Sequence, residues 1–318
     1  MVPDTPVSRS VCIPPPSSLL YDGPAMKNLV LPQLLLLLLS FTVAAQSTTQ
    51  ESKPLFPSDL NSKVTGTNTT YLELLRRVIP DLETNANDPD IGMGHKTIPI
   101  KHLSDNSAVE ALEGDIKLET FVPQWIKSDG RRVLLLDIDL SAEAANQGTP
   151  YEGESNLLAA FVIEPSVKLL DAIDMKTDRF SGFWDEGRVF HLTAQSDAFV
   201  VDSSHSNAGE SYEDITVLFL NRDRFETITN MFILNTQGCG ATFTETPSFR
   251  AQPGSTKYPN VLVTVKVKKE ADPPECDHRT PGWVKVYQGL YQWNAAKNEY
   301  RTTSRQLSAL DRFNRNRM

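Results

Sequence analysis

Short apolar runs alternate with compact polar clusters between Arg188 and Leu234. Two of the clusters, residues 203–211 (SSHSNAGES) and 221–224 (NRDR), have the composition of turns between strands. Within residues 215–220 both alternating sets of side chains are largely apolar, which predicts a strand buried on both faces. The stretch therefore predicts an antiparallel meander with a hairpin at 221–224.

Four further segments carry the same signals. Residues 159–175 predict a hairpin with a break at 164–167, and residues 283–300 predict a final hairpin. Residues 261–267 alternate Val with Thr and Lys, which predicts a half-exposed strand near a sheet edge. Residues 132–140 predict a strand with one aliphatic face and two aspartates on the other.

Helical signals lie on either side of these strands. Thr70 and Glu73 form a capping-box pattern before a short helix that Pro80 ends. Residues 304–317 carry Leu and Phe at helical spacing and predict a C-terminal capping helix. We therefore expect an all-β or β-dominated fold of antiparallel hairpins, a sandwich or an incomplete propeller-like set, with short N-terminal and C-terminal helices.

Composition divides the chain into five stretches. They are an upstream extension that is not native (1–25), a signal peptide (26–45), a flexible leading segment (46–66), an N-terminal mixed segment that packs on the body (67–130), and a β-rich body with its C-terminal helix (131–318). Translation from Met1 and from Met26 both stay open.

The leader consists of a short basic start, an apolar run and small residues before Gln46, which is typical of a secretory signal cleaved after Ala45. A membrane anchor is the alternative, but Pro32 and Gln33 interrupt the run, which is short for a span of roughly 20 apolar residues. We expect a secreted or periplasmic protein with no stable membrane span after cleavage.

Cleavage would leave Cys239 and Cys276 in a compartment that permits disulfides, so the sequence favours a bridge between them. Two unpaired buried thiols, a reactive Cys239, and a metal site shared with histidines are the alternatives, although the spacing follows no zinc pattern. We expect no metal and no cofactor. The formal net charge of −9 offers no basic stripe for nucleic acid.

Asp137 and Asp139 are the first catalytic candidates, because alternation along a strand points both carboxylates to one face. Asp-x-Asp-x-Ser after an apolar strand superficially resembles the first motif of haloacid-dehalogenase-type enzymes, but the parallel sheet and later acidic metal motif of that family are not evident. An acid/base pair of a glycosidase is a second alternative. The sequence favours a third, a solvated strand end before a polar loop.

His205 is the other catalytic candidate, within Ser203–Asn207. A Ser204–His205 pair cannot cooperate in an extended strand, where neighbours point to opposite faces, so we favour a hairpin loop with an exposed histidine. Residues 85–92 (NANDPDIG) gather oxygen ligands that a calcium loop would need. They do not follow the EF-hand spacing, so an ordinary polar turn is favoured and calcium binding stays open.

Phe183 and Trp184, in a Gly-containing turn, and Trp293 are candidates for binding a sugar or peptide by stacking, although aromatics more often cover a β core. The long loop at 141–156 is our first choice for a contact surface. No complete catalytic constellation is evident. The sequence therefore favours an exported, soluble binding or accessory protein without catalytic activity, acting on an unknown protein or glycan. A secreted hydrolase using Asp137/Asp139 or His205, and a carbohydrate-binding β domain, are the alternatives.

Overall fold

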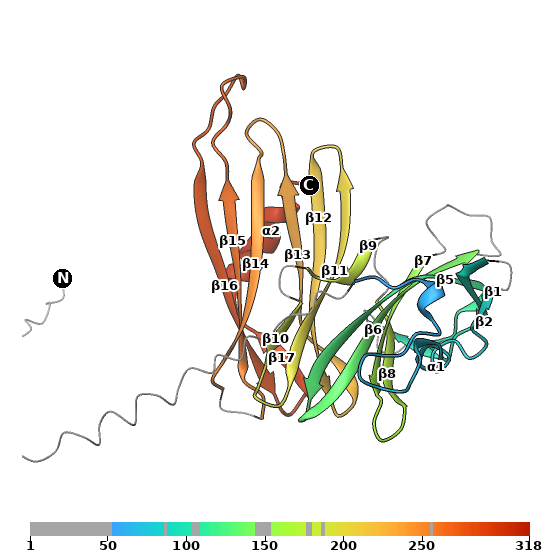
Figure 1. Ribbon diagram of the computed structural model, residues 1–318. Helices are drawn as coiled ribbons and strands as arrows, with labels where there is room; N and C mark the ends of the chain where they lie inside the picture. Colours follow the sequence, from blue (N-terminus) through green and yellow to red (C-terminus); the bar gives the residue numbers. More distant parts are fainter. Residues whose placement is uncertain are drawn as a thin grey trace, which may run out of the picture. The chain divides into compact units, whose positions relative to one another are not determined.

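The computed structural model describes residues 53–85, 88–103, 109–143, 154–175, 180–185, 188–254 and 257–318, all within the compact unit Glu51–Met318. The leader and the upstream extension lie outside the described residues. Strands dominate these ranges (Figure 1). The elements are a 3-10 helix (Pro57–Asp59), α1 (Tyr71–Leu75), β1 (Glu83–Asn85), β2 (Asp88–Lys96), β3 (Ile100–His102), β4 (Val109–Glu110), β5 (Glu113–Ser128), β6 (Arg131–Glu143), β7 (Glu154–Val162), β8 (Lys168–Asp174), β9 (Phe180–Phe183), β10 (Val189–His191), β11 (Asp197–Asn207), β12 (Glu210–Asn221), β13 (Arg224–Thr236), β14 (Phe243–Gln252), β15 (Asn260–Lys269), β16 (Trp283–Asn294), β17 (Glu299–Thr302) and α2 (Arg305–Arg315).

The strands form two sheets. The first sheet has the order β1-β2-β5-β6-β7-β8-β3-β4, and the second has the order β10-β11-β12-β13-β14-β15-β16-β17, with β9 also paired to β11. Among the described residues, every strand pairing is antiparallel except that of β3 with β8. The predicted β-dominated fold of antiparallel hairpins with short helices at both ends is confirmed, and the stacked sheets are consistent with a β sandwich.

The outer face of the first sheet is covered by the N-terminal segment. Thr70 and Glu73 make both hydrogen bonds of the predicted capping box at the start of α1. Residues 46–66 are expected from the sequence to be flexible, but from Leu55 onward this segment is packed. Leu55 pairs with Phe121 of β5, and Leu60 is fully buried. The apolar side chains around α1 therefore belong to one core with the aliphatic face of β6.

The second sheet folds back on itself. Alternate residues of β12 (Ile215, Val217 and Phe219) share one apolar cluster, which we name the fold-back core, with the valines of β15. Strand β15 lies third from the end of the sheet but is not an edge strand, because it pairs with β14 on one side and β16 on the other. Its half-exposed pattern has another cause: one face contacts the core, while Lys266 and Lys268 on the other face water.

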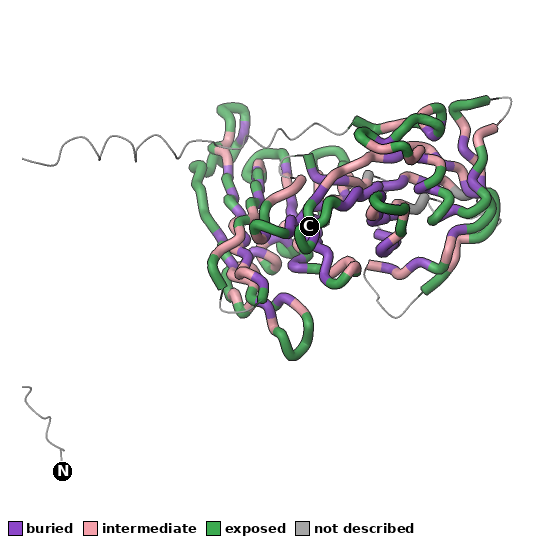
Figure 2. The backbone as a smooth tube through the Cα atoms, turned by 60° about the horizontal axis from the view of Figure 1, so that its bottom comes forward, coloured by how far each residue is buried: buried purple, intermediate pink, exposed green. Residues whose placement is uncertain are grey.

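The two sheets contact each other through a second apolar cluster, which we name the joint. Its buried members are Ile126, Val133, Leu135, Leu158, Ala160, Leu170, Ile173, Met175, Phe183, Phe199, Val201, Leu218 and Leu220. Because β12 contributes to the joint on one face and to the fold-back core on the other, residues 215–220 are buried on both faces, as predicted. Figure 2 shows how buried, intermediate and exposed residues are distributed along the backbone.

The polar clusters of the central meander behave differently from each other. Residues 221–224 form the predicted tight hairpin between β12 and β13, with positive φ at Arg222 and Asp223. The predicted loop over 203–211 is wrong. Strand β11 continues through Asn207, and only Ala208 and Gly209 turn the chain. Pairing with β12 along its whole length keeps this polar segment extended.

Cys239 and Cys276 form the predicted disulfide, with their Cα atoms 5.6 Å apart. The bridge joins the β13–β14 loop to the connector between β15 and β16. No helix among the described residues is long and apolar enough to cross a membrane.

Candidate functional site

Asp137 lies in the middle of β6, which continues to Glu143, and its side chain points into the joint. The residue is only 5% exposed, so the favoured reading of a solvated strand end is wrong for Asp137. Sequence periodicity placed it on the correct face but could not show that a second sheet covers that face. Asp139 is half-buried on the same face.

The surroundings of Asp137 change its protonation. Burial, followed by the charge of Asp139, raises the pKa of Asp137 to about 8, although the Phe183 N–H and Arg188 oppose this. One carboxylate oxygen of Asp137 is buried without a hydrogen-bond partner among the described residues, and a Cβ at Gly182 would lie 3.0 Å from the other. A buried carboxyl with a raised pKa is the state that a general acid needs.

A second carboxyl with a raised pKa, that of Asp202, lies on β11 of the second sheet. Burial and the charge of Glu213 raise the pKa of Asp202 to about 6, and Arg188 again opposes the shift. Arg188 ion-pairs with Asp185 at 2.7 Å, and its other terminal nitrogen is buried without a partner among the described residues. Arg188 is therefore within electrostatic reach of both Asp137 and Asp202.

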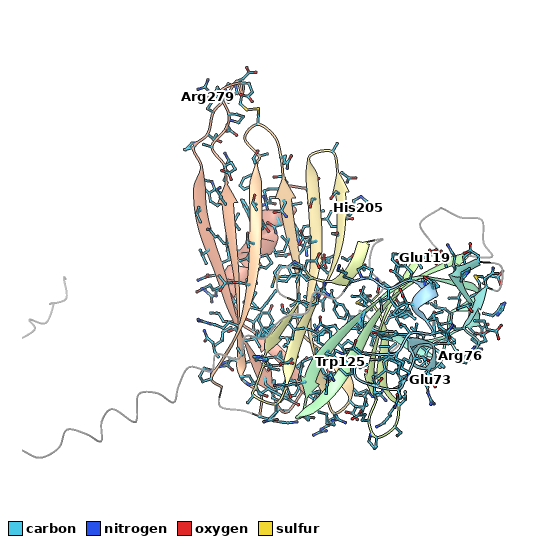
Figure 3. The ribbon with its side chains drawn as sticks, viewed as in Figure 1. Glu73, Arg76, Glu119, Trp125, His205 and Arg279 are labelled. Carbon is cyan, nitrogen blue, oxygen red and sulfur yellow. A yellow bond between two sulfur atoms is a disulfide. The ribbon has the colours of Figure 1, made fainter. Side chains whose placement is uncertain are left out.

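His205 lies on the polar half of β11 (Figure 3). Its ring stacks on Tyr212 with centroids 5.2 Å apart, and its Nε2 lies 3.2 Å from Oδ1 of Asn207. These contacts pair the histidine across β11 and β12 as a sheet surface does. Asp137 and Asp139 share one face of β6, whereas the contacts shown for His205 are with Tyr212 and Asn207.

The candidate aromatic residues are buried. Phe183 lies in the joint, 6.5 Å from Phe199 between ring centroids. Trp184 and Trp293 are 8% and 7% exposed in the fold-back core, and Trp293 contacts Tyr258 edge-on. Each of the three rings contacts another aromatic ring of the core, and sugar stacking on them stays a prediction.

The remaining sequence candidates are only partly covered. Residues 88–92 of the calcium-like segment form part of β2, while 86–87 lie outside the described residues, as do 144–153 of the long loop. In the described ranges, no three His, Cys, Asp or Glu side chains are grouped so that they could hold a metal ion.

Helix α2 lines a large cavity, and the placement of the helix begins with a gap in the second sheet. Among the described residues β13 and β14 pair only at Thr236 and Phe243. Beside that point α2 is held between the two strands (Figure 1). Asn314 donates to the Phe232 carbonyl at 3.2 Å, and Arg317, beyond the helix, ion-pairs with the buried Glu245.

The other end of α2 is fixed on β16. Ser304 caps the helix by accepting from the Leu307 N–H at 3.3 Å. Gln288 accepts a hydrogen bond from Ser304 and donates one to Gln306, both through its backbone. Leu307 packs so closely on Gly289 that a Cβ there would lie 2.3 Å from a Leu307 methyl group. The helix is thereby fixed at both ends.

A groove of about 1060 Å³ follows this helix. We name it the α2 groove; its lining residues are Asp214, Asn230, Met231, Phe232, Val265, Tyr291, Thr302, Thr303, Ser304, Arg305, Leu307, Ser308, Leu310, Asp311, Arg312, Arg315 and Met318. Aliphatic and aromatic side chains line it together with three arginines and two aspartates. The lining is thus cationic by one charge, in a protein whose formal net charge is −9.

Two of the three arginines are available to a ligand. Arg315 pairs with Asp311 at 3.1 Å, four residues earlier on the helix. Arg305 and Arg312 make no side-chain hydrogen bond or ion pair with the described residues, and both are exposed. Seven residues separate them, so they project from the same side of the helix about 10 Å apart along its axis.

Sequence reasoning missed the α2 groove. The signal that could have indicated it is the repetition of Arg305, Ser308 and Arg312 at helical spacing beside the apolar Leu307 and Leu310. The other wall comes from β12, β13, β15, β16 and β17, and most of these strands are distant from the helix in sequence.

Comparisons with protein-family models, curated proteins and solved structures found no match for this chain.

Proposed function

We propose that this protein is an exported, non-catalytic binding protein whose ligand lies in the α2 groove. The groove itself carries the proposal: its volume of about 1060 Å³ is at the upper end of the sizes that ligand sites occupy. Its walls come from strands distant in sequence and from a helix anchored at both ends, which favours a preformed site.

The lining chemistry supports an elongated amphiphile with an anionic group. Met231, Leu307 and Leu310 offer apolar surface along the groove, and an alkyl chain would be removed from water there. Arg305 and Arg312 offer planar donor groups that match a carboxylate or sulfate. No histidine or cysteine is among the groove's described lining residues, which favours binding over catalysis.

The compartment is part of the proposal. The leader at 26–45 has the pattern of a cleaved secretory signal. The Cys239–Cys276 bridge fits an oxidising environment, since disulfides persist outside the reducing cytosol. A protein of the periplasm or the cell exterior would meet free amphiphiles there.

The test is titration of the purified protein with 11-(dansylamino)undecanoic acid, followed by dansyl fluorescence. We expect saturable binding, and about tenfold weaker affinity in Arg312→Gln, because a charge-assisted hydrogen bond is lost. Arg77→Gln is the matched control, since Arg77 is exposed on the N-terminal segment and outside the groove. Absence of saturable binding, or equal affinities in both variants, would refute the groove as the site.

A secreted hydrolase is the second candidate, and the raised pKa of Asp137 beside Asp139 favours it. Neither aspartate nor His205 lines the α2 groove. Activity on an ester, peptide, phosphate and glycan panel that disappears in Asp137→Asn or Asp139→Asn would support this candidate. A panel without activity would remove it.

A further inference from the structure

A second cavity, of about 290 Å³, lies at the far end of the β5–β6 hairpin. Its lining residues are Gly66, Thr67, Trp125, Arg131, Arg132, Val162, Ile163 and Glu164. They come from the N-terminal segment, the β5–β6 hairpin and the end of β7, so three separate parts of the chain enclose it. Figure 3 shows Trp125 far from His205 and Arg279.

One face of the Arg132 guanidinium in this cavity packs on the ring of Trp125. The Arg132 guanidinium carbon lies 3.7 Å from the centroid of the Trp125 ring, the geometry of a close cation–π contact. This contact fixes the plane of the guanidinium but uses none of its N–H groups. Arg132 makes no side-chain hydrogen bond or ion pair with the described residues. Its donor edge is therefore oriented and available.

The neighbouring arginine shows the contrast. Arg131 donates to Asp223 across the joint, and Lys168 lies 3.5 Å from the same carboxylate. Two cations thus share Asp223, and the hydrogen bond from Arg131 lowers the pKa of the Asp223 carboxyl. Glu164 at the rim is exposed. Among the cations of this cavity, Arg132 is the one whose charge the described carboxylates do not neutralise by direct contact.

We propose that this cavity binds a small carboxylate with an apolar tail. The carboxylate accepts two hydrogen bonds from the edge of Arg132, since the planar fork of a guanidinium matches the two oxygens. The tail lies against Trp125, Val162 and Ile163, where it leaves water. The site is separate from the α2 groove and shares no lining residue with it.

The test is titration of the purified protein with hexanoate, followed by isothermal calorimetry and tryptophan fluorescence. Acetate lacks the tail and hexan-1-ol lacks the charge, and we expect each to bind at least tenfold more weakly than hexanoate. Arg132→Gln is expected to weaken hexanoate binding by about tenfold to a hundredfold, as loss of a charge-assisted bidentate contact does. Trp125→Phe keeps a ring under Arg132 and should remove most of the fluorescence change.

Arg77→Gln is the matched control, because Arg77 is exposed and lines neither cavity, and Arg305→Gln tests whether hexanoate binds in the α2 groove instead. Thermal unfolding of each variant shows whether it folds as the unmodified protein does. Equal hexanoate affinity in Arg132→Gln and the unmodified protein would overturn the proposal, and so would equal binding of hexan-1-ol. Loss of hexanoate binding in Arg305→Gln with retention in Arg132→Gln would assign hexanoate to the α2 groove and refute this cavity.

Discussion

Asn314 of α2 donates a hydrogen bond from Nδ2 to Oε2 of Glu245 on β14 at 2.9 Å, and neither side chain is exposed to water. The same amide donates to the Phe232 carbonyl of β13. Glu245 also accepts from the Leu234 N–H at 3.2 Å. Side chains thus replace the backbone ladder where β13 and β14 separate, and the helix closes the sheet.

Asn314→Ala should destabilise the protein by about 3 kcal/mol, because it leaves the Glu245 carboxylate and the Phe232 carbonyl buried with fewer donors. Urea unfolding measures the change in the free energy of unfolding. Asn316→Ala is the matched control, since Asn316 is exposed at the end of the same helix and should change stability little. Equal effects would show that the buried amide has no special role.

Burial makes the stability of the joint depend on pH. The folded pKa of Asp137, about 8, lies above its ordinary value of 3.8, so the folded state holds a proton that the unfolded state has lost between these values. The free energy of unfolding should therefore fall as pH rises from about 4 to about 8, by up to about 1.4 kcal/mol per pH unit from this group. Asp137→Asn should remove that dependence and stabilise the protein at pH 8.

Asp202 provides the internal comparison for this measurement. Its folded pKa of about 6 limits its contribution to the range between about 4 and 6. Asp202→Asn should therefore leave the slope between pH 6 and 8 intact, whereas Asp137→Asn should flatten it. An Asp137→Asn protein whose unfolding free energy keeps the original slope up to pH 8 would contradict the raised pKa.

The disulfide should contribute to global stability. Cys239 and Cys276 are 37 residues apart, and closing a loop of that length stabilises by about 4 kcal/mol in the chain-entropy model. The double variant Cys239→Ser, Cys276→Ser should unfold at correspondingly lower urea concentration. Reduction of the unmodified protein is the control, and it should produce the same shift without any change of sequence.

A polar pair joins the two sheets at the β12–β13 hairpin. Arg224 donates to Asp171 of β8 at 2.7 Å, and the Phe225 N–H donates to the other carboxylate oxygen at 2.9 Å. The Arg224 side chain is 59% exposed, so solvent screening should keep the coupling energy below about 1 kcal/mol. A double-mutant cycle of Asp171→Asn and Arg224→Gln measures it, and Asp171→Asn should be the more costly single change.

Local chemistry made several elements predictable from the sequence. Thr70 with Glu73, and the aspartate and asparagine of residues 221–224, specify their structures within four residues. The alternation at 261–267 gave the buried face of β15 correctly. It could not give the position of β15 within the sheet, since an exposed face and an exposed edge produce similar patterns.

Tertiary contacts account for what the sequence could not reveal. Asp137 is buried because β9 and β11 cover β6, and nothing near residue 137 encodes that layer. The polar run at 203–207 stays extended because β12 pairs with it. The α2 groove could not be predicted for the same reason: Arg312 and Met231 line one groove only because α2 packs where β13 and β14 separate.

The insertion of Asn314 and Arg317 between two strands also bears on solubility. Deleting residues 314–318 would expose the edges of β13 and β14 that face each other. The unpaired N–H and C=O groups of these edges could pair with a strand of another molecule. Such a shortened protein should self-associate as its concentration rises. A few side chains at the C-terminal end of α2 therefore protect this fold from polymerisation.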